Sequence, residues 1–306
     1  MIYTLGCSAA KWYWPTWADW LQVYKGPVRN FGYKAYGNDN IYWTILNNLK
    51  NFRSDDEIYI MWTQNHRLGQ WYDTDWINNK DILDFFPNTK GKIWYTDEEN
   101  YRGMYRVHPD FMPSLTQMIV YQFQTILSTQ LILDKFNLKY TMMFLQNPFL
   151  DVRPIFSPKF EMVWHKKQII SEQEQIFSDA LLKLEPVSNL IKLIDWDKFI
   201  DAPNDPMQSA TYYGLWEYFF NKKEYLIYRH DTDKHPVSLA YHDYALEKIC
   251  KQNPKKGKFR STAVQITQQV MSRPIPGFTA YDFVAHPDSN LLFDDYKKIL
   301  DELRSY

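Results

Sequence analysis

Short apolar segments that alternate with longer amphipathic ones constrain the fold of this chain most. The apolar runs 1–5, 57–62 and 139–145 have the length and composition of strands buried on both faces. Helices are predicted between them, at 15–24, 41–49 and 114–136. This order is typical of strand–helix–strand units with right-handed crossovers. We therefore expect an α/β fold, a three-layer sandwich around a central, mostly parallel sheet.

The rest of the chain is expected to be insertions and further helices. Residues 63–113 and 147–170 carry Gly, Pro, Asn and Asp without a long period, which indicates two loop insertions. More helices are predicted at 171–184, 188–199, 241–251 and 294–304. We expect one domain over 1–250, followed by a C-terminal extension over 251–306 that packs on the same domain.

Composition and charge exclude several classes of protein. The 306 residues suit one large domain, and 35 Lys and Arg against 36 Asp and Glu give a net charge of −1. This balance provides no electrostatic basis for binding nucleic acid or an anionic membrane, and the short basic run 255–258 is interpreted as a solvated loop. With neither a signal peptide nor an apolar run long enough to span a bilayer, we expect a cytoplasmic or virion-associated protein.

Two short motifs at opposite ends of the chain suggest a nucleophile and its base. Gly6-Cys7-Ser8 follows the first predicted strand, and Asp233-Lys234-His235-Pro236 lies far along the chain. A serine hydroxyl needs an imidazole to accept its proton and a carboxylate to fix the imidazole tautomer. Ser8, His235 and Asp233 are therefore the candidate catalytic residues, with Asp231 as an alternative carboxylate. Each motif alone is also compatible with a chance tripeptide or an ordinary turn.

The order of these motifs resembles the SGNH (GDSL-like) hydrolase family, especially its divergent phage and marine-microbial members. The matching blocks are Gly6-Cys7-Ser8, the aromatic stretch 11–21, the segment from Asn30-Phe31-Gly32 through Gly37-Asn38-Asp39-Asn40-Ile41, and Asp233-Lys234-His235-Pro236 followed by Ser238 and His242. The resemblance covers most of 1–250. It implies an SGNH/flavodoxin-like fold and a serine esterase that needs no cofactor and removes acyl groups, such as acetyl, from a carbohydrate or another small ester.

The family's oxyanion hole is matched only in part. The resemblance assigns oxyanion donors to the backbone N–H groups of Ser8 and Gly37 and to an Asn side chain in a third block. After the strand 57–62 this chain has Thr63-Gln64-Asn65-His66-Arg67 instead of that block. Each donor in such a site is worth about 3 kcal/mol. Gln64, Asn65 and Arg67 remain candidates there, and Thr63 could serve with a shifted loop.

Aromatic residues make up 18% of the chain and gather beside the nucleophile. The segment 11–20 contains Trp12, Tyr13, Trp14, Trp17 and Trp20, and we expect some of these rings to line a cleft. Aromatic rings also fill cores, which is the competing interpretation for any one of them. Trp12 and Trp14 are candidate substrate-binding residues, together with Asn38 and Arg67.

Other functions remain open at this stage. The fold could serve as a catalytically weak glycan-binding or virion-associated module, or as an acyltransferase on the same triad. We expect no metal site, although His230, Asp231 and His235 lie close together in the sequence. Cys7 is expected to pack rather than to react, and His242 to hold its loop in place. An oligomer is compatible with the sequence.

Overall fold

The computed structural model describes residues 1–12, 14–33, 36–63, 68–71, 92–95, 115–149, 172–226 and 235–272. Its centre is a four-stranded, all-parallel sheet with the strand order β2-β1-β3-β6. The strands are β1 (Ile2–Leu5), β2 (Val28–Asn30), β3 (Glu57–Trp62) and β6 (Lys139–Phe144). Leu5 pairs with Ile60 and Ile60 with Met142, so the carboxyl ends of β1, β3 and β6 lie at one edge of the sheet. The predicted α/β class is confirmed.

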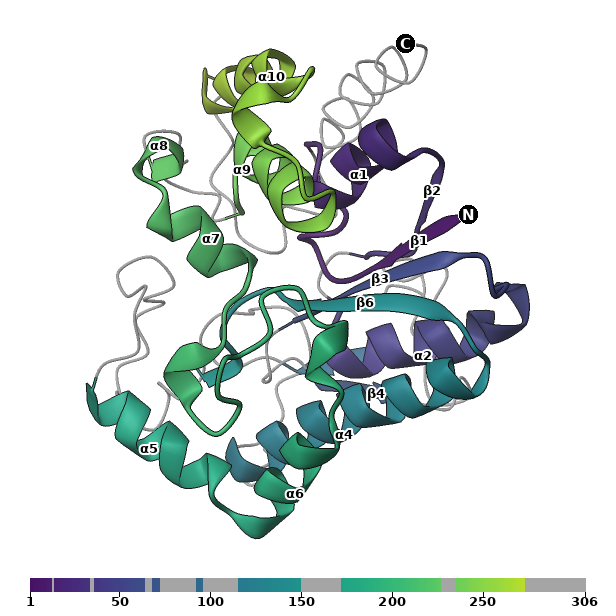
Figure 1. Ribbon diagram of the computed structural model, residues 1–306, viewed down its shortest axis with the longest axis vertical. Coiled ribbons are helices and arrows are strands. Elements are labelled where there is room, and N and C mark those ends of the chain that lie inside the picture. Colours follow the sequence, from purple (N-terminus) through teal and green to yellow (C-terminus); the bar gives the residue numbers. More distant parts are fainter. Residues whose placement is uncertain are drawn as a thin grey trace.

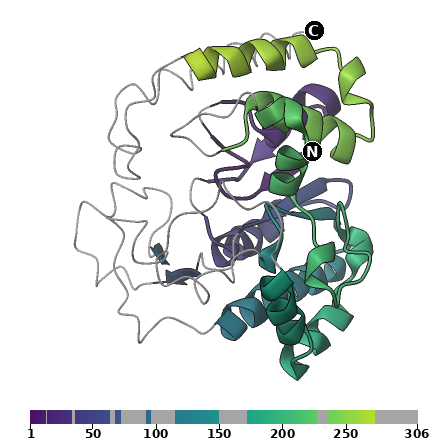
Figure 2. The same cartoon turned by 90° about the vertical axis from the view of Figure 1, so that its left-hand side faces the viewer.

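Helices cover both faces of the sheet and give three layers (Figures 1 and 2). One layer contains α1 (Trp17–Lys25), α9 (Ser238–Tyr244) and α10 (Arg260–Ser272), which pack on one another. The opposite layer contains α2 (Asn38–Asn48) and α4 (Leu115–Lys135), with α6 (Glu185–Leu193) packed on α4. The remaining α-helices described are α5 (Glu172–Leu182), α7 (Leu215–Asn221) and α8 (Lys223–Leu226).

The sequence pattern missed a short polar strand and a hairpin, and it misplaced the ends of two helices. β2 has three residues, two of which are Arg29 and Asn30, so it shows no apolar run. The helix predicted at 241–251 begins earlier, at Ser238, and continues as a π-helix over Ala245–Ile249. The predicted 188–199 helix ends at Leu193. A hairpin of β4 (Leu68–Trp71) and β5 (Lys92–Tyr95) lies in the first predicted insertion, whereas 294–304 lies outside the described residues.

Most of the described aromatic residues serve the core. Trp17 and Trp20 of α1 and Trp62 of β3 are completely buried. A second group of packed rings comes from α4, from the last residue of β6 and from the chain beyond it; it includes Phe123, Phe144, Phe149, Trp196 and Tyr212. The high aromatic content therefore provides much of the area that this sandwich buries.

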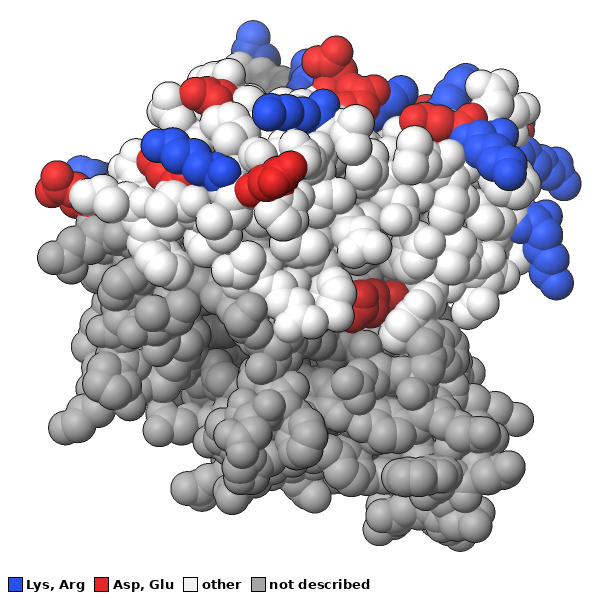
Figure 3. Space-filling model, turned by 90° about the horizontal axis from the view of Figure 1, so that it is seen from below, with Lys and Arg blue, Asp and Glu red and all other residues white. Residues whose placement is uncertain are grey.

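Figure 3 shows one face of the molecule, on which the described residues carry charges of both signs. Figure 3 shows lysines and arginines mixed with carboxylates along one edge of that face, beside a wide area without charge. Within the described helices, none combines the length and the low polarity that a bilayer crossing requires.

Candidate active site

Ser8 lies in a tight loop immediately after β1. The loop closes through hydrogen bonds from Ala10 N–H to the Cys7 carbonyl (2.9 Å) and from Lys11 N–H to the Ser8 carbonyl (3.2 Å). A Cβ atom added to Gly6 would lie 3.0 Å from the Ala10 Cβ, so the chain can turn this sharply because both residues are small. The loop places Ser8 at the carboxyl edge of the sheet, where open α/β sheets bind ligands.

Side chains from two other segments fix this loop. The Ala10 carbonyl accepts hydrogen bonds from Asn30 Nδ2 (2.6 Å) and from the Thr16 hydroxyl (2.8 Å). Asn30 Oδ1 accepts the Gly32 N–H (2.8 Å), and a Cβ on Gly32 would lie 2.7 Å from the Ala10 Cβ. Sequence reasoning gave Asn30 and Thr16 no role. The Asn-x-Gly pattern at 30–32 was the available signal, since Asn often accepts the N–H two residues on.

The structure brings His235 to Ser8, 227 residues away in sequence. The His235 Nε2 and the Ser8 Oγ are 2.8 Å apart, within hydrogen-bond distance. The Trp12 ring stacks on the imidazole with a centroid distance of 3.5 Å and an interplanar angle of 24°. Ser8 is 5% exposed, whereas His235 is only partly buried. A hydroxyl and a ring nitrogen in this geometry can exchange a proton.

The tryptophan-rich segment, residues 11–20, holds the histidine segment, residues 235–238, in place. Trp14 Nε1 donates to the Pro236 carbonyl (2.9 Å), next to His235. Trp20 Nε1 donates to the Ser238 hydroxyl (3.1 Å), which in turn donates to the Pro15 carbonyl (3.1 Å). Trp12 and Trp14 are 7% and 4% exposed, so these rings pack against the histidine segment rather than present open faces to a ligand.

The start of α2 is organised differently from the expected oxyanion hole. The Gly37 N–H donates to Asn40 Oδ1 (3.2 Å), so it is engaged within its own helix turn. Asn38, a candidate for substrate contact, is 5% exposed and pairs with the backbone of Thr63. Its Oδ1 accepts the Thr63 N–H (2.8 Å), and its Nδ2 donates to the Thr63 carbonyl (3.2 Å). Asn38 therefore orders the end of β3.

Several predicted site residues lie outside the described residues. They are Gln64, Asn65, Arg67 and Asp233, and also Asp231 and His230. Their roles stay predictions. Among the residues that are described, no group of three or more His, Cys, Asp or Glu side chains is arranged to hold a metal ion.

His242, which is completely buried, lies in a second hydrogen-bonded chain. Its Nε2 lies 2.6 Å from the Tyr24 hydroxyl and its Nδ1 lies 2.7 Å from Asp243 Oδ1. The other oxygen of Asp243 accepts from the Tyr225 hydroxyl (2.9 Å) and from Arg260 Nη2 (3.1 Å). Burial raises the pKa of Tyr24 to about 12, so this phenol stays protonated at neutral pH. The chain links α1, α8, α9 and α10, as expected for a residue that holds its loop.

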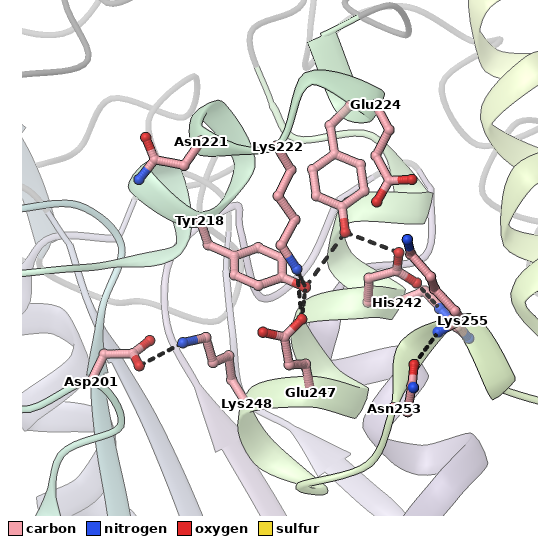
Figure 4. Close-up of polar contacts among 12 residues, drawn as sticks. Asp201, Tyr218, Asn221, Lys222, Glu224, His242, Glu247, Lys248, Asn253 and Lys255 are labelled. Carbon is pink, nitrogen blue, oxygen red and sulfur yellow. Dashed lines mark hydrogen bonds and ion pairs between the residues drawn. The ribbon is translucent and has the colours of Figure 1, made fainter.

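A partly exposed cluster beside that chain ties α7 to the π-helix (Figure 4). Lys222 Nζ lies 2.6 Å from Glu247 Oε2, and the Tyr218 hydroxyl donates to the same oxygen (2.9 Å). Lys248 forms an ion pair with Asp201 (2.7 Å). The cluster and the Tyr225–Asp243 bond therefore tie α7 and α8 to the π-helix and α9. Trp14 and Trp20 hold the chain just after His235, at Pro236 and Ser238.

A separate hollow of about 740 Å³ lies at the other edge of the sheet. Its lining includes Tyr24, Pro27, Asn253, Lys256 and Phe259. The Pro27 carbonyl accepts the N–H of Ile2 at the start of β1, whereas Ser8 follows the end of that strand. The hollow is therefore remote from Ser8 and His235, and we do not assign it to their chemistry.

Comparison of the chain with protein-family models, with curated proteins and with solved structures finds no match in any of the three.

Proposed function

We propose that this protein is a serine hydrolase of the SGNH type that cleaves small carboxylic esters. One observation carries the proposal: the 2.8 Å contact between Ser8 Oγ and His235 Nε2, which joins the two motifs that resemble the family's first and last blocks. The parallel sheet and the position of Ser8 beyond its carboxyl edge support the same conclusion.

The proposed reaction uses Ser8 as the nucleophile and His235 as the general base. His235 Nε2 accepts the proton as Ser8 Oγ attacks the acyl carbon, and the carbonyl oxygen becomes an oxyanion. Collapse of this intermediate breaks the ester bond, and His235 returns the proton to the leaving alcohol. Water activated by the same imidazole then hydrolyses the acyl-serine. Asp233 is proposed to orient the ring through Nδ1.

The substrate class is proposed to be an ester with a small acyl group, such as an O-acetylated carbohydrate. Ser8 is 5% exposed, and its partner His235 stacks on the buried ring of Trp12, which favours acetyl over longer chains. The carbohydrate part rests on the family resemblance. A cytoplasmic or virion-associated location stays a prediction.

A fluorophosphonate probe tests the nucleophile. Wild type should form a covalent adduct on Ser8, and Ser8→Ala should form none. Cys7→Ala is the matched control, since Cys7 is the adjacent side chain and is completely buried; this variant should label like wild type. Activity on p-nitrophenyl acetate should exceed that on the butyrate and octanoate, and should disappear in Ser8→Ala.

Other outcomes would favour the alternative functions. Absence of labelling, together with binding to an acetylated glycan that Ser8→Ala retains, would support a binding module. Acetyl transfer to an added alcohol that exceeds hydrolysis in the same assay would support an acyltransferase. Labelling of Cys7 in place of Ser8 would contradict the proposed nucleophile.

A further inference from the structure

We propose that the hydroxyl of Thr63 donates a hydrogen bond to the oxyanion that forms when Ser8 attacks its substrate. This inference rests on the proposed hydrolase function and adds a catalytic residue to it. Three observations on Thr63 carry it: the strand that it follows, the way its backbone is held, and the state of its hydroxyl.

Thr63 follows β3, which lies next to the strand that ends before Ser8. The parallel register of β1 and β3 pairs Leu5 with Ile60. One residue further on, a Cβ atom on Gly6 would lie 3.3 Å from the Met61 Cβ, so the two chains stay in contact past the last paired residue of β1. Beyond this point the first chain turns into the Ser8 loop, and the second reaches Thr63 two residues after Met61. The two residues thus end neighbouring strands at the same edge of the sheet.

The backbone of Thr63 is fixed on both sides. Asn38 binds its N–H and its carbonyl, at 2.8 and 3.2 Å. The preceding carbonyl, that of Trp62, accepts the Leu145 N–H at 2.7 Å. A donor held in this way needs little reorganisation when charge develops near it, which is the property that makes oxyanion holes effective.

The hydroxyl of Thr63 is buried without a hydrogen-bond partner among the described residues. Thr63 is 3% exposed. Buried hydroxyl groups in folded proteins nearly always have a partner, and an exception needs an explanation. An oxyanion that exists only during the reaction provides one, since the partner is then absent from the resting enzyme.

The choice of Thr63 also depends on the other candidate donors to the oxyanion, the Gly37 N–H and the Asn40 side-chain amide. The Gly37 N–H is already engaged by Asn40, so the Ser8 N–H needs a second donor from elsewhere. Asn40 Nδ2 is a rival donor, because it is buried and also lacks a partner among the described residues. We favour Thr63, which directly follows β3, the neighbour of the strand that precedes Ser8, and whose hydroxyl can rotate. Thr63 would then replace the amide of the family's third block.

The decisive variant is Thr63→Val, which keeps the shape of the side chain and removes the donor. We expect kcat for p-nitrophenyl acetate to fall about 100-fold to 1,000-fold with KM nearly unchanged. The thermal midpoint should stay equal or rise, because a methyl group replaces an unpartnered hydroxyl. Thr63→Ser retains the donor and should keep kcat within about tenfold of wild type. A structural role for Thr63 would instead lower the midpoint and leave kcat per folded molecule unchanged.

The matched control is Asn40→Asp, which keeps the oxygen that accepts the Gly37 N–H but loses the amide donor. The inference is overturned if Thr63→Val retains wild-type kcat, or if Asn40→Asp slows the reaction while Thr63→Val does not. Should Thr63→Val fail to fold, Thr63→Ala against Thr63→Ser gives the same comparison. Failure of the proposed function is distinguishable, because wild type itself would then lack Ser8-dependent hydrolysis.

Discussion

Two histidines seven positions apart in the sequence have opposite environments. His235 is partly exposed, stacks on Trp12 and meets the hydroxyl of Ser8. His242 is completely buried between the Tyr24 phenol and the Asp243 carboxylate. Both have a hydroxyl within hydrogen-bond distance of Nε2, so contact geometry alone does not separate a catalytic base from a structural link.

The difference lies in what surrounds each pair. A Ser–His pair is useful when the hydroxyl can reach a substrate and the ring can gain and lose a proton. The Tyr24 phenol remains protonated up to a pKa of about 12, and Arg260 neutralises the carboxylate at the far end of its chain. We therefore expect His235 to control activity and His242 to control stability.

The largest expected effect separates the two histidines directly. His235→Gln should lower kcat/KM on p-nitrophenyl acetate by about 1,000-fold or more, because the base is lost. Its free energy of unfolding should change by less than about 0.5 kcal/mol, as is usual for a partly exposed side chain. The identical change at His242 should leave kcat/KM within about threefold and lower the free energy of unfolding by about 2 kcal/mol. Initial rates measure kcat/KM, and urea denaturation measures the free energy of unfolding. If His235→Gln lost stability and His242→Gln lost activity instead, the two roles would be wrongly assigned.

The next effect tests the buried end of the His242 chain. Asp243→Asn removes a charge that is 1% exposed and that contacts His242, Tyr225 and Arg260. We expect the free energy of unfolding to fall by about 3 kcal/mol, because hydrogen bonds to a charged group are lost and Arg260 loses a buried partner. Tyr225→Phe, which removes one of these contacts, should cost about 1 kcal/mol. Equal losses in the two variants would contradict a central role for the carboxylate.

Some of this arrangement was predictable from the sequence because it depends on local patterns. The strands at 57–62 and 139–145 contain the uninterrupted apolar runs 58–62 and 142–145, and the nucleophile follows shortly after the first strand. Their parallel pairing followed from the helices between them. The Ser8–His235 pair was predicted from two motifs, and the structure places the two side chains together.

The rest depends on contacts that no local pattern encodes. Trp14 donates to the carbonyl of Pro236, 222 positions away, and the sequence around Trp14 gives no signal for this contact. Asn38 was a candidate for substrate contact, yet it binds the backbone of Thr63. Tertiary packing determines whether an Asn or a Trp side chain is buried or exposed, and this cannot be derived from composition.

A smaller effect on both rate and stability is expected at Asn30, which shapes the Ser8 side of the pair. Asn30→Ala leaves the Ala10 carbonyl with the Thr16 hydroxyl alone and the Gly32 N–H without its acceptor. We expect a loss of about 1–2 kcal/mol in the free energy of unfolding. We also expect about a tenfold lower kcat, because Ser8 is less well positioned. Asn30→Asp keeps the acceptor for Gly32 and should recover part of the stability. An unchanged kcat in Asn30→Ala would show that Ser8 is positioned without this contact.

The smallest expected effect concerns Glu247, whose cluster ties α7 to the π-helix. Burial alone would raise the pKa of Glu247, but the hydrogen bonds and charge of Lys222 and the bond from Tyr218 outweigh it and lower this pKa below its ordinary value of 4.5. A lowered pKa in the folded state stabilises the protein above the unfolded value, and this contribution is lost as the pH falls through the folded value. The Glu247 side chain is 37% exposed, so the difference between wild type and Glu247→Gln at pH 7 should be below about 1 kcal/mol. Urea midpoints at pH 7, 5 and 3 should show this difference shrinking only below about pH 4.5, while kcat at pH 7 stays the same in both proteins. A Glu247→Gln variant that instead lost activity at pH 7 would show that this cluster controls the position of His235, and the division between a catalytic and a structural histidine would then be less sharp than the contacts indicate.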